Sequence, residues 1–147
     1  MKRTAIAMLF APAILAGCAA SSGQGSSMDV TVDNMQNHNW VLESVDGKAL
    51  ALPEGFAAPN LEIGEAFAAN GHGGCNRYFG QAELKGDQFR IDKMATTMMA
   101  CPEPAMALEG VMSNVLGNWS SVELGKETLV LKNSDHTLRF QLTDGTN

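Results

Sequence analysis

Residues 71–80 read Gly-His-Gly-Gly-Cys-Asn-Arg-Tyr-Phe-Gly, so four glycines fall within ten positions. Glycine adopts backbone conformations, and permits close approaches of other segments, that side chains forbid. The chain is therefore predicted to turn sharply, to bulge, or to contact another segment closely at this place. Cys75 lies within the stretch, and Cys101 follows it 26 positions later. We expect the fold to be organised around this loop and its second cysteine.

The first residues have the features of a processing segment. Lys2 and Arg3 precede a short apolar run, and the run ends in a sequence typical of a bacterial lipobox, Leu15-Ala16-Gly17-Cys18. A run of about twelve apolar residues is too short for a bilayer, which needs roughly twenty. Residues 1–17 are therefore predicted to be a lipoprotein signal peptide, cleaved so that Cys18 becomes acylated.

Two further expectations follow from the lipobox. Ala19 stands where lipoproteins retained at the inner membrane often carry Asp, so we expect an outer-membrane protein anchored by Cys18 on the periplasmic face. Residues 18–35 are predicted to be a lipidated flexible tether, because residues 20–27 are small, polar and rich in Gly and Ser. Residues 36–147 are long enough for one folded domain.

The net charge limits the class of partner, and the number of cysteines predicts a disulfide. Without Lys2 and Arg3, eight basic residues remain against 16 acidic ones, and this balance argues against nucleic acid as a partner. Once Cys18 is lipidated, Cys75 and Cys101 form an even pair in an oxidising compartment, which is typical of a disulfide. We expect no cofactor and a monomer.

The apolar pattern predicts an α+β domain. Short strands with apolar alternation, joined by Gly- and Asp-containing turns, are expected near residues 40–45, 61–63, 77–84, 88–92, 120–124, 128–132 and 137–142. One amphipathic helix is expected, with five apolar residues on one stripe: Leu108, Val111, Met112, Val115 and Leu116. The predicted architecture is a curled, barrel-like antiparallel sheet of about eight short strands packed on this helix.

The cysteine loop admits other chemistry besides a disulfide. His72 could activate Cys75 as a nucleophile, with Asn76 or Glu103 orienting the imidazole, but a disulfide would consume the thiolate. A zinc site formed by His72, Cys75 and Cys101 would lack a fourth ligand. No Ser/His/Asp, paired-carboxylate or metal-ligand pattern is present elsewhere, so we do not expect an enzyme.

The residues flanking the cysteines also have alternative interpretations. Four methionines surround Cys101 in the sequence, namely Met94, Met98, Met99 and Met106. They could fill the core, bind Cu(I) through their thioethers, or line a soft apolar groove. Arg77 is predicted to be half-buried, with Asn76 holding the turn, and its alternative role is recognition of a partner.

Four segments together resemble the META domain family, in particular its HslJ-like heat-shock lipoproteins. Residues 74–80 resemble the family signature G-C-N-R-F-x-G, and residues 95–101 are similar to its T-x-M-x-C segment. Residues 40–48 resemble the opening strand and turn, and residues 128–131 the closing strands. The resemblance covers about residues 36–143, and its motif residues here are Gly74, Asn76, Arg77, Gly80 and Thr97.

The resemblance implies a non-enzymatic periplasmic protein linked to envelope stress, including heat, and to antibiotic tolerance. We expect it to bind an envelope protein or an apolar ligand under the helix. The alternative is a protease inhibitor or a secretion or assembly pilot that binds one protein partner. In that case residues 53–59, with Phe56 exposed, would form the presenting loop.

Overall fold

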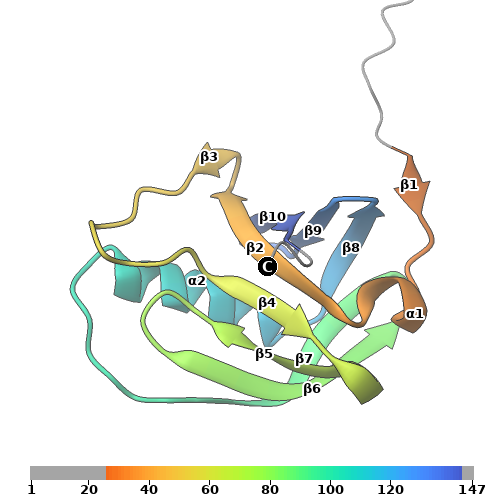
Figure 1. Ribbon diagram of the computed structural model, residues 1–147, viewed down its shortest axis with the longest axis horizontal. Coiled ribbons are helices and arrows are strands. Elements are labelled where there is room, and N and C mark those ends of the chain that lie inside the picture. Colours follow the sequence, from red (N-terminus) through yellow and green to blue (C-terminus); the bar gives the residue numbers. More distant parts are fainter. Residues whose placement is uncertain (1–25, 144–147) are drawn as a thin grey trace, which may run out of the picture.

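The computed structural model describes residues 26–143 (Figure 1). The predicted signal peptide, Cys18 and the first part of the predicted tether lie outside the described residues. Within the described part, no helix has the length and apolar character needed to cross a bilayer.

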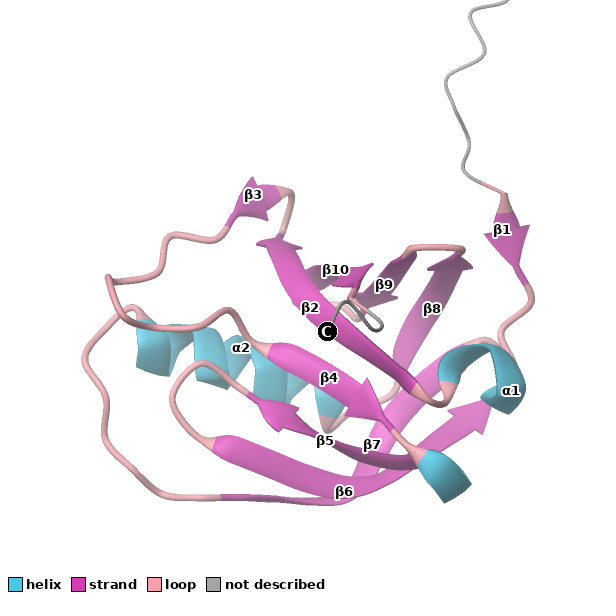
Figure 2. Cartoon of the chain, viewed as in Figure 1, coloured by secondary structure: helices cyan, strands magenta, loops and turns pink. Residues whose placement is uncertain are grey.

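Eight antiparallel strands form a closed barrel, which confirms the predicted barrel-like antiparallel sheet of about eight strands. The β8–β9 pairing closes a circuit that runs β8-β7-β6-β5-β4-β2-β10-β9. The strands of this circuit are β2 (His38–Val45), β4 (Asn60–Ile63), β5 (Ala68–His72), β6 (Arg77–Lys85), β7 (Gln88–Thr96), β8 (Ser120–Gly125), β9 (Thr128–Lys132) and β10 (Thr137–Leu142). Two short strands add to it: β1 (Ser27–Met28) pairs with β8, and β3 (Lys48–Ala49) pairs with β2 (Figure 2).

The predicted helix is α2 (Ala105–Leu116), which connects β7 to β8 and contributes its apolar stripe to the core. Met112, Val115 and Leu116 are fully buried, and Leu108 and Val111 pack against the same core as partly buried residues. The helix ends at Gly117, whose N–H donates to Ser113 O. Two shorter helices are present among the described residues, α1 (Val32–Met35) and η1 (Glu65–Phe67).

Alternate residues of each strand point into the barrel, and because these residues are apolar the interior is apolar. On β7, Phe89 and Ile91 are buried, as their alternation predicts, and Trp40 and Phe140 are buried on β2 and β10. The core is continuous from the strands to α2. A single domain around one core is therefore what the sequence folds into.

The boundary predicted for the tether is wrong. Strand β1 and helix α1 both lie within residues 18–35, so the folded part already includes residues from Ser27 onward. Met35 is fully buried, and Met28 and Val30 pack against the core as partly buried residues. The Thr31 hydroxyl accepts the Asn34 N–H at the start of α1. These apolar anchors and this helix cap explain why the segment is ordered although its neighbours are rich in Gly and Ser.

Candidate functional site

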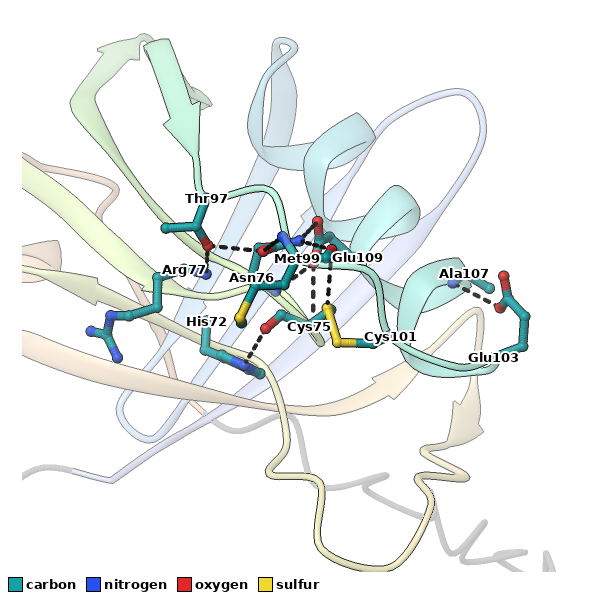
Figure 3. Close-up of a disulfide and its surroundings, with 10 residues drawn as sticks. All are labelled: His72, Cys75, Asn76, Arg77, Thr97, Met99, Cys101, Glu103, Ala107 and Glu109. Carbon is teal, nitrogen blue, oxygen red and sulfur yellow. Dashed lines mark hydrogen bonds between the residues drawn. A yellow bond between two sulfur atoms is a disulfide. The ribbon is translucent and has the colours of Figure 1, made fainter.

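The site centres on the disulfide between Cys75 and Cys101, whose Cα atoms lie 5.8 Å apart (Figure 3). Cys75 belongs to the loop between β5 and β6 and is buried, whereas Cys101 precedes α2. The predicted disulfide is thus present and joins the glycine-rich loop to the entrance of the helix. With its sulfur in the disulfide, Cys75 offers no thiolate, so the structure contradicts the nucleophile hypothesis. Among residues 26–143, no group of three or more His, Cys, Asp and Glu side chains is placed to hold a metal ion.

Asn76 ties the loop to the segment that follows β7. Its Oδ1 accepts hydrogen bonds from Met99 N at 2.6 Å and from Thr97 Oγ at 2.9 Å. Its Nδ2 donates to Met99 O at 3.0 Å and to Glu109 Oε1 at 2.9 Å. The side chain is buried, and a buried amide needs this full set of partners. Asn76 therefore holds the turn, as expected, and also fixes a second segment.

Glu109 is the carboxylate of this site, and it is not among the site residues predicted from the sequence. Its Oε2 accepts the backbone N–H groups of Asn76 at 2.6 Å and Cys75 at 3.2 Å. Glu103, an orienting residue in the nucleophile hypothesis, instead accepts the N–H of Ala107 at 3.0 Å and so satisfies one donor at the helix start (Figure 3). The helical pattern of the sequence could have indicated Glu109. It lies four residues after Ala105 and three before Met112, so it shares a helix face with these two buried residues. A carboxylate at such a position needs hydrogen-bond donors.

His72 contacts the loop backbone rather than a sulfur atom. Its Nε2 lies 3.1 Å from Cys75 O, and a carbonyl oxygen only accepts, so Nε2 carries the proton. Nδ1 is buried without a hydrogen-bond partner among the described residues. His72 thus braces the loop and does not act as a base toward Cys75.

Gly74 is required by the close packing of the loop on α2. Its φ of +134° is a conformation that side-chain-bearing residues rarely adopt. A Cβ at this position would also lie 2.8 Å from Ala105 O and 3.2 Å from Glu109 N. Gly80 is similarly constrained, because a Cβ there would collide with Ile91 where the register of β6 and β7 shifts. Both glycines of the predicted motif therefore serve close approaches of backbone.

The META domain model matches residues 33–145, which include the loop, the disulfide and the helix. The chain belongs to the META domain family. It is also 30% identical over 132 residues to the heat shock protein HslJ of Escherichia coli (strain K12), and the match spans 89% of each chain.

Solved structures of similar proteins agree with the META fold. A protein solved by NMR has 31% identity and a TM-score of 0.69, over 80% of this chain and 99% of its own. A second NMR structure, of a protein from Burkholderia xenovorans, has a TM-score of 0.66 over 99% of this chain and 100% of its own. Its identity of 23% makes it a likeness of fold.

The META motif also carries an outward-facing side. Arg77 is exposed, so the prediction that it is half-buried is wrong. After the loop, strand alternation resumes with Tyr78 inward, which turns Arg77 and Phe79 outward, and the Phe79 side chain is 60% exposed. Thr97 lies beside this strand, because its Oγ accepts Arg77 N at 3.2 Å and its N–H donates to Arg77 O.

The methionines around Cys101 divide into two groups. Met94 packs against the core as a partly buried residue, but Met98 is 95% exposed and Met99 is 59% exposed. The core-packing interpretation therefore fails for Met98 and Met99. We refer to the exposed residues Arg77, Phe79, Met98 and Met99 as the signature surface.

Proposed function

We propose that this META-family protein is a non-enzymatic lipoprotein, anchored by Cys18 on the periplasmic face of the outer membrane. It contributes to envelope stress resistance, including heat, and to antibiotic tolerance by binding a protein partner through the signature surface. The observation that carries the proposal is the exposure of Phe79, Met98 and Met99 beside Arg77. Arg, Met and aromatic residues are the types enriched at protein interfaces.

The construction beneath this surface supports the proposal. The disulfide and the bonds of Asn76 and Glu109 fix the backbone on which Arg77 and Met99 are mounted. A rigid backbone lowers the entropy lost when a partner binds. Large apolar side chains that stay exposed on a rigid backbone are therefore better suited to binding a partner than to filling the core of the protein.

The cellular setting rests on other observations. The lipobox ending at Cys18 supports the lipid anchor, and the disulfide fits an oxidising compartment. The name of the Escherichia coli relative, a heat shock protein, supports a role in the response to heat. The disulfide-bonded loop contains no free thiolate, and this supports binding rather than catalysis.

Photo-crosslinking in intact cells tests the proposal. A crosslinking amino acid at position 79 or 98 is expected to capture one protein partner, whereas one at the exposed Lys132 on β9 is not. With the crosslinker at position 98, Arg77→Glu with Phe79→Ala should abolish capture, and the same double variant without a crosslinker should fail to restore heat and drug tolerance to a deletion strain. Equal capture from Lys132 would contradict the proposal. A single stoichiometric partner that is a protease or a secretion component would favour the inhibitor or pilot alternative.

A second candidate function, binding of an apolar ligand, is favoured by one groove. A space of about 340 Å³ lies between α2 and the segment of residues 45–51, which runs from the end of β2 past β3. It is lined on the helix by Ala107, Leu108 and Val111 and on the other side by Val45 and Leu50. Mass spectrometry of gently purified protein should then show a retained small molecule, and Ala107→Trp should release it. By contrast, the loop at residues 53–59 gains no support, because Phe56 is half-buried rather than exposed.

A further inference from the structure

A polar hollow lies far from the signature surface, at the opposite end of β7. Its volume of about 790 Å³ is within the range of small-molecule sites. It is bounded by the start of β7, the end of α2, the start of β8 and the turn after β9. None of the four residues of the signature surface lines it. The hollow is therefore a separate feature of the molecule.

Trp119 supplies an aromatic wall to this hollow. The residue is half-buried, and the guanidinium carbon of Arg90 lies 4.7 Å from the ring centroid. Arg90 does not line the hollow, so the cation and the hollow contact different parts of the indole. A cation over the ring orients it and holds it in place. The hollow thus contains a fixed aromatic surface.

Four of the ten residues that line the hollow carry amide side chains, namely Gln88, Asn114, Asn118 and Asn133. Asn133 Nδ2 donates to Asn114 Oδ1 at 2.8 Å, and Asn114 Nδ2 donates to Asp135 at 3.3 Å, which fixes the floor. At the rim, Asn118 Nδ2 is bonded to Asn114 O, while its Oδ1 has no partner among the described residues. The exposed Gln88 amide likewise has none within residues 26–143. Each open amide presents hydrogen-bonding atoms to whatever occupies the hollow.

The charged residues that line the hollow limit the class of ligand that it could bind. Lys132, Glu123 and Asp135 are the charged residues that line the hollow, and two of the three are acidic. A polyanion or a phosphorylated ligand would meet net repulsion there. A neutral ligand that offers both an apolar face and many hydroxyl groups matches the aromatic wall and the amides.

We propose that this hollow binds a neutral oligosaccharide of glucose-configured pyranoses. Pyranoses with equatorial hydroxyls present axial C–H groups on both faces, and one such face would pack on the Trp119 ring. The hydroxyls around the edge of the sugar would then reach Gln88 and Asn118. In the envelope, the binding would hold the domain against a glycan while the signature surface stays accessible.

The two indole N–H signals give a direct test by NMR. The chain has two tryptophans, and the other, Trp40, is only 1% exposed. Titration with cellotetraose or chitotetraose should shift the Trp119 indole signal and the Gln88 and Asn118 side-chain amides saturably, and leave Trp40 unchanged. A β-1,4-linked galactotetraose should bind more weakly, because its axial O4, which carries the glycosidic bond, interrupts one C–H face and changes the shape of the chain.

Variants separate stacking from folding and from the proposed function. Trp119→Ala should abolish binding, Trp119→Phe should weaken it about tenfold or less, and Gln88→Ala, at an exposed position, should weaken it in a folded protein. Phe79→Ala should leave sugar binding intact even where it abolishes capture of the protein partner. The proposal is overturned if no oligosaccharide gives a saturable shift, if the galactose polymer binds equally well, or if Gln88→Ala and Trp119→Phe leave binding unchanged.

Discussion

At the scale of single residues, a few polar side chains hold the loop in place by hydrogen bonding to its backbone and to the segments that pack against it. Asn76 and its role could be predicted from the sequence, since an amide beside glycines commonly fixes a turn. Glu109 could not be assigned, because nothing in the sequence says which loop supplies donors to a helix carboxylate. The exposure of Arg77 also escaped prediction, because the glycine loop resets the alternation of β6.

Glu109→Ala should destabilise the protein by about 2 kcal/mol, because it leaves the N–H groups of Cys75 and Asn76 without an acceptor. Urea unfolding measures this loss. The matched control is Glu103→Ala, just before the same helix, which removes only one exposed bond to Ala107 and should cost about 1 kcal/mol or less. Equal losses for the two variants would contradict the role given to Glu109.

Tyr78 is the only tyrosine of the chain, and burial raises the pKa of its hydroxyl well above the ordinary value. The hydroxyl donates to Asn60 O at 2.6 Å. Above about pH 10 the unfolded chain loses this proton while the folded protein keeps it, so the free energy of unfolding should fall as pH rises. Near-ultraviolet titration should show tyrosinate appearing only with unfolding. Tyr78→Phe should cost about 1 kcal/mol at neutral pH and should remove Tyr78's contribution to the alkaline decline.

At the scale of elements, the spacing of apolar residues predicted the long helix and strands correctly but did not predict the short ones. Helix α2 and the strand pair β6–β7 carry clear patterns and were predicted close to where they lie. Helix α1 has four residues, too few for a period, and docks through the buried Met35. The order of that segment arises from tertiary packing, which a local pattern does not contain.

The disulfide connects two elements, the β5–β6 loop and the entrance of α2, and its loss should cost about 3–4 kcal/mol through the entropy of the unfolded chain. Cys101→Ser should lower the melting temperature by several degrees and make Cys75 alkylatable on unfolding. Calorimetry and mass spectrometry measure the two effects, with Cys18 replaced so that it adds no thiol. Alkylation of both Cys75 and Cys101 in the native, unreduced protein would rule out the bond.

At the scale of the whole molecule, the sequence indicates a curled antiparallel sheet but not its closure. The barrel depends on pairings such as β2 with β10, in which Trp40 lies opposite Leu142 across most of the chain. Register between strands so distant is set by core packing and by the turns, and one sequence does not specify it. The class of fold could therefore be predicted, while the circuit of strands could not.

One long-range contact of the barrel should depend on pH. Asp46, in the turn after β2, accepts from His136 at 2.9 Å and from Thr137 N at 2.7 Å, and the His136 hydrogen bond is the main cause that lowers the pKa of its carboxyl. The stabilisation is present above the ordinary pKa of Asp, about 4, and is lost as pH falls through the lowered value. Asp46→Asn should lower the urea midpoint at neutral pH, and its difference from the wild type should vanish in acid.

The control for this pair is Glu54→Gln, at an exposed position in the loop after β3, which should leave the urea midpoint unchanged at every pH. A difference between Asp46→Asn and the wild type that stays constant into strong acid would show that the carboxylate charge does not matter.

The docking of β1 on β8 limits how far the domain can stand from the bilayer. If Cys18 carries the acyl chains, about eight residues separate the anchor from the first residue held by the barrel, a leash of at most about 28 Å. A leash running to residue 35 would have reached about twice as far. An anchor at Cys18 would then keep the domain within a few tens of ångströms of the lipid headgroups, so the molecules within its reach would be those embedded in that membrane or lying at its surface.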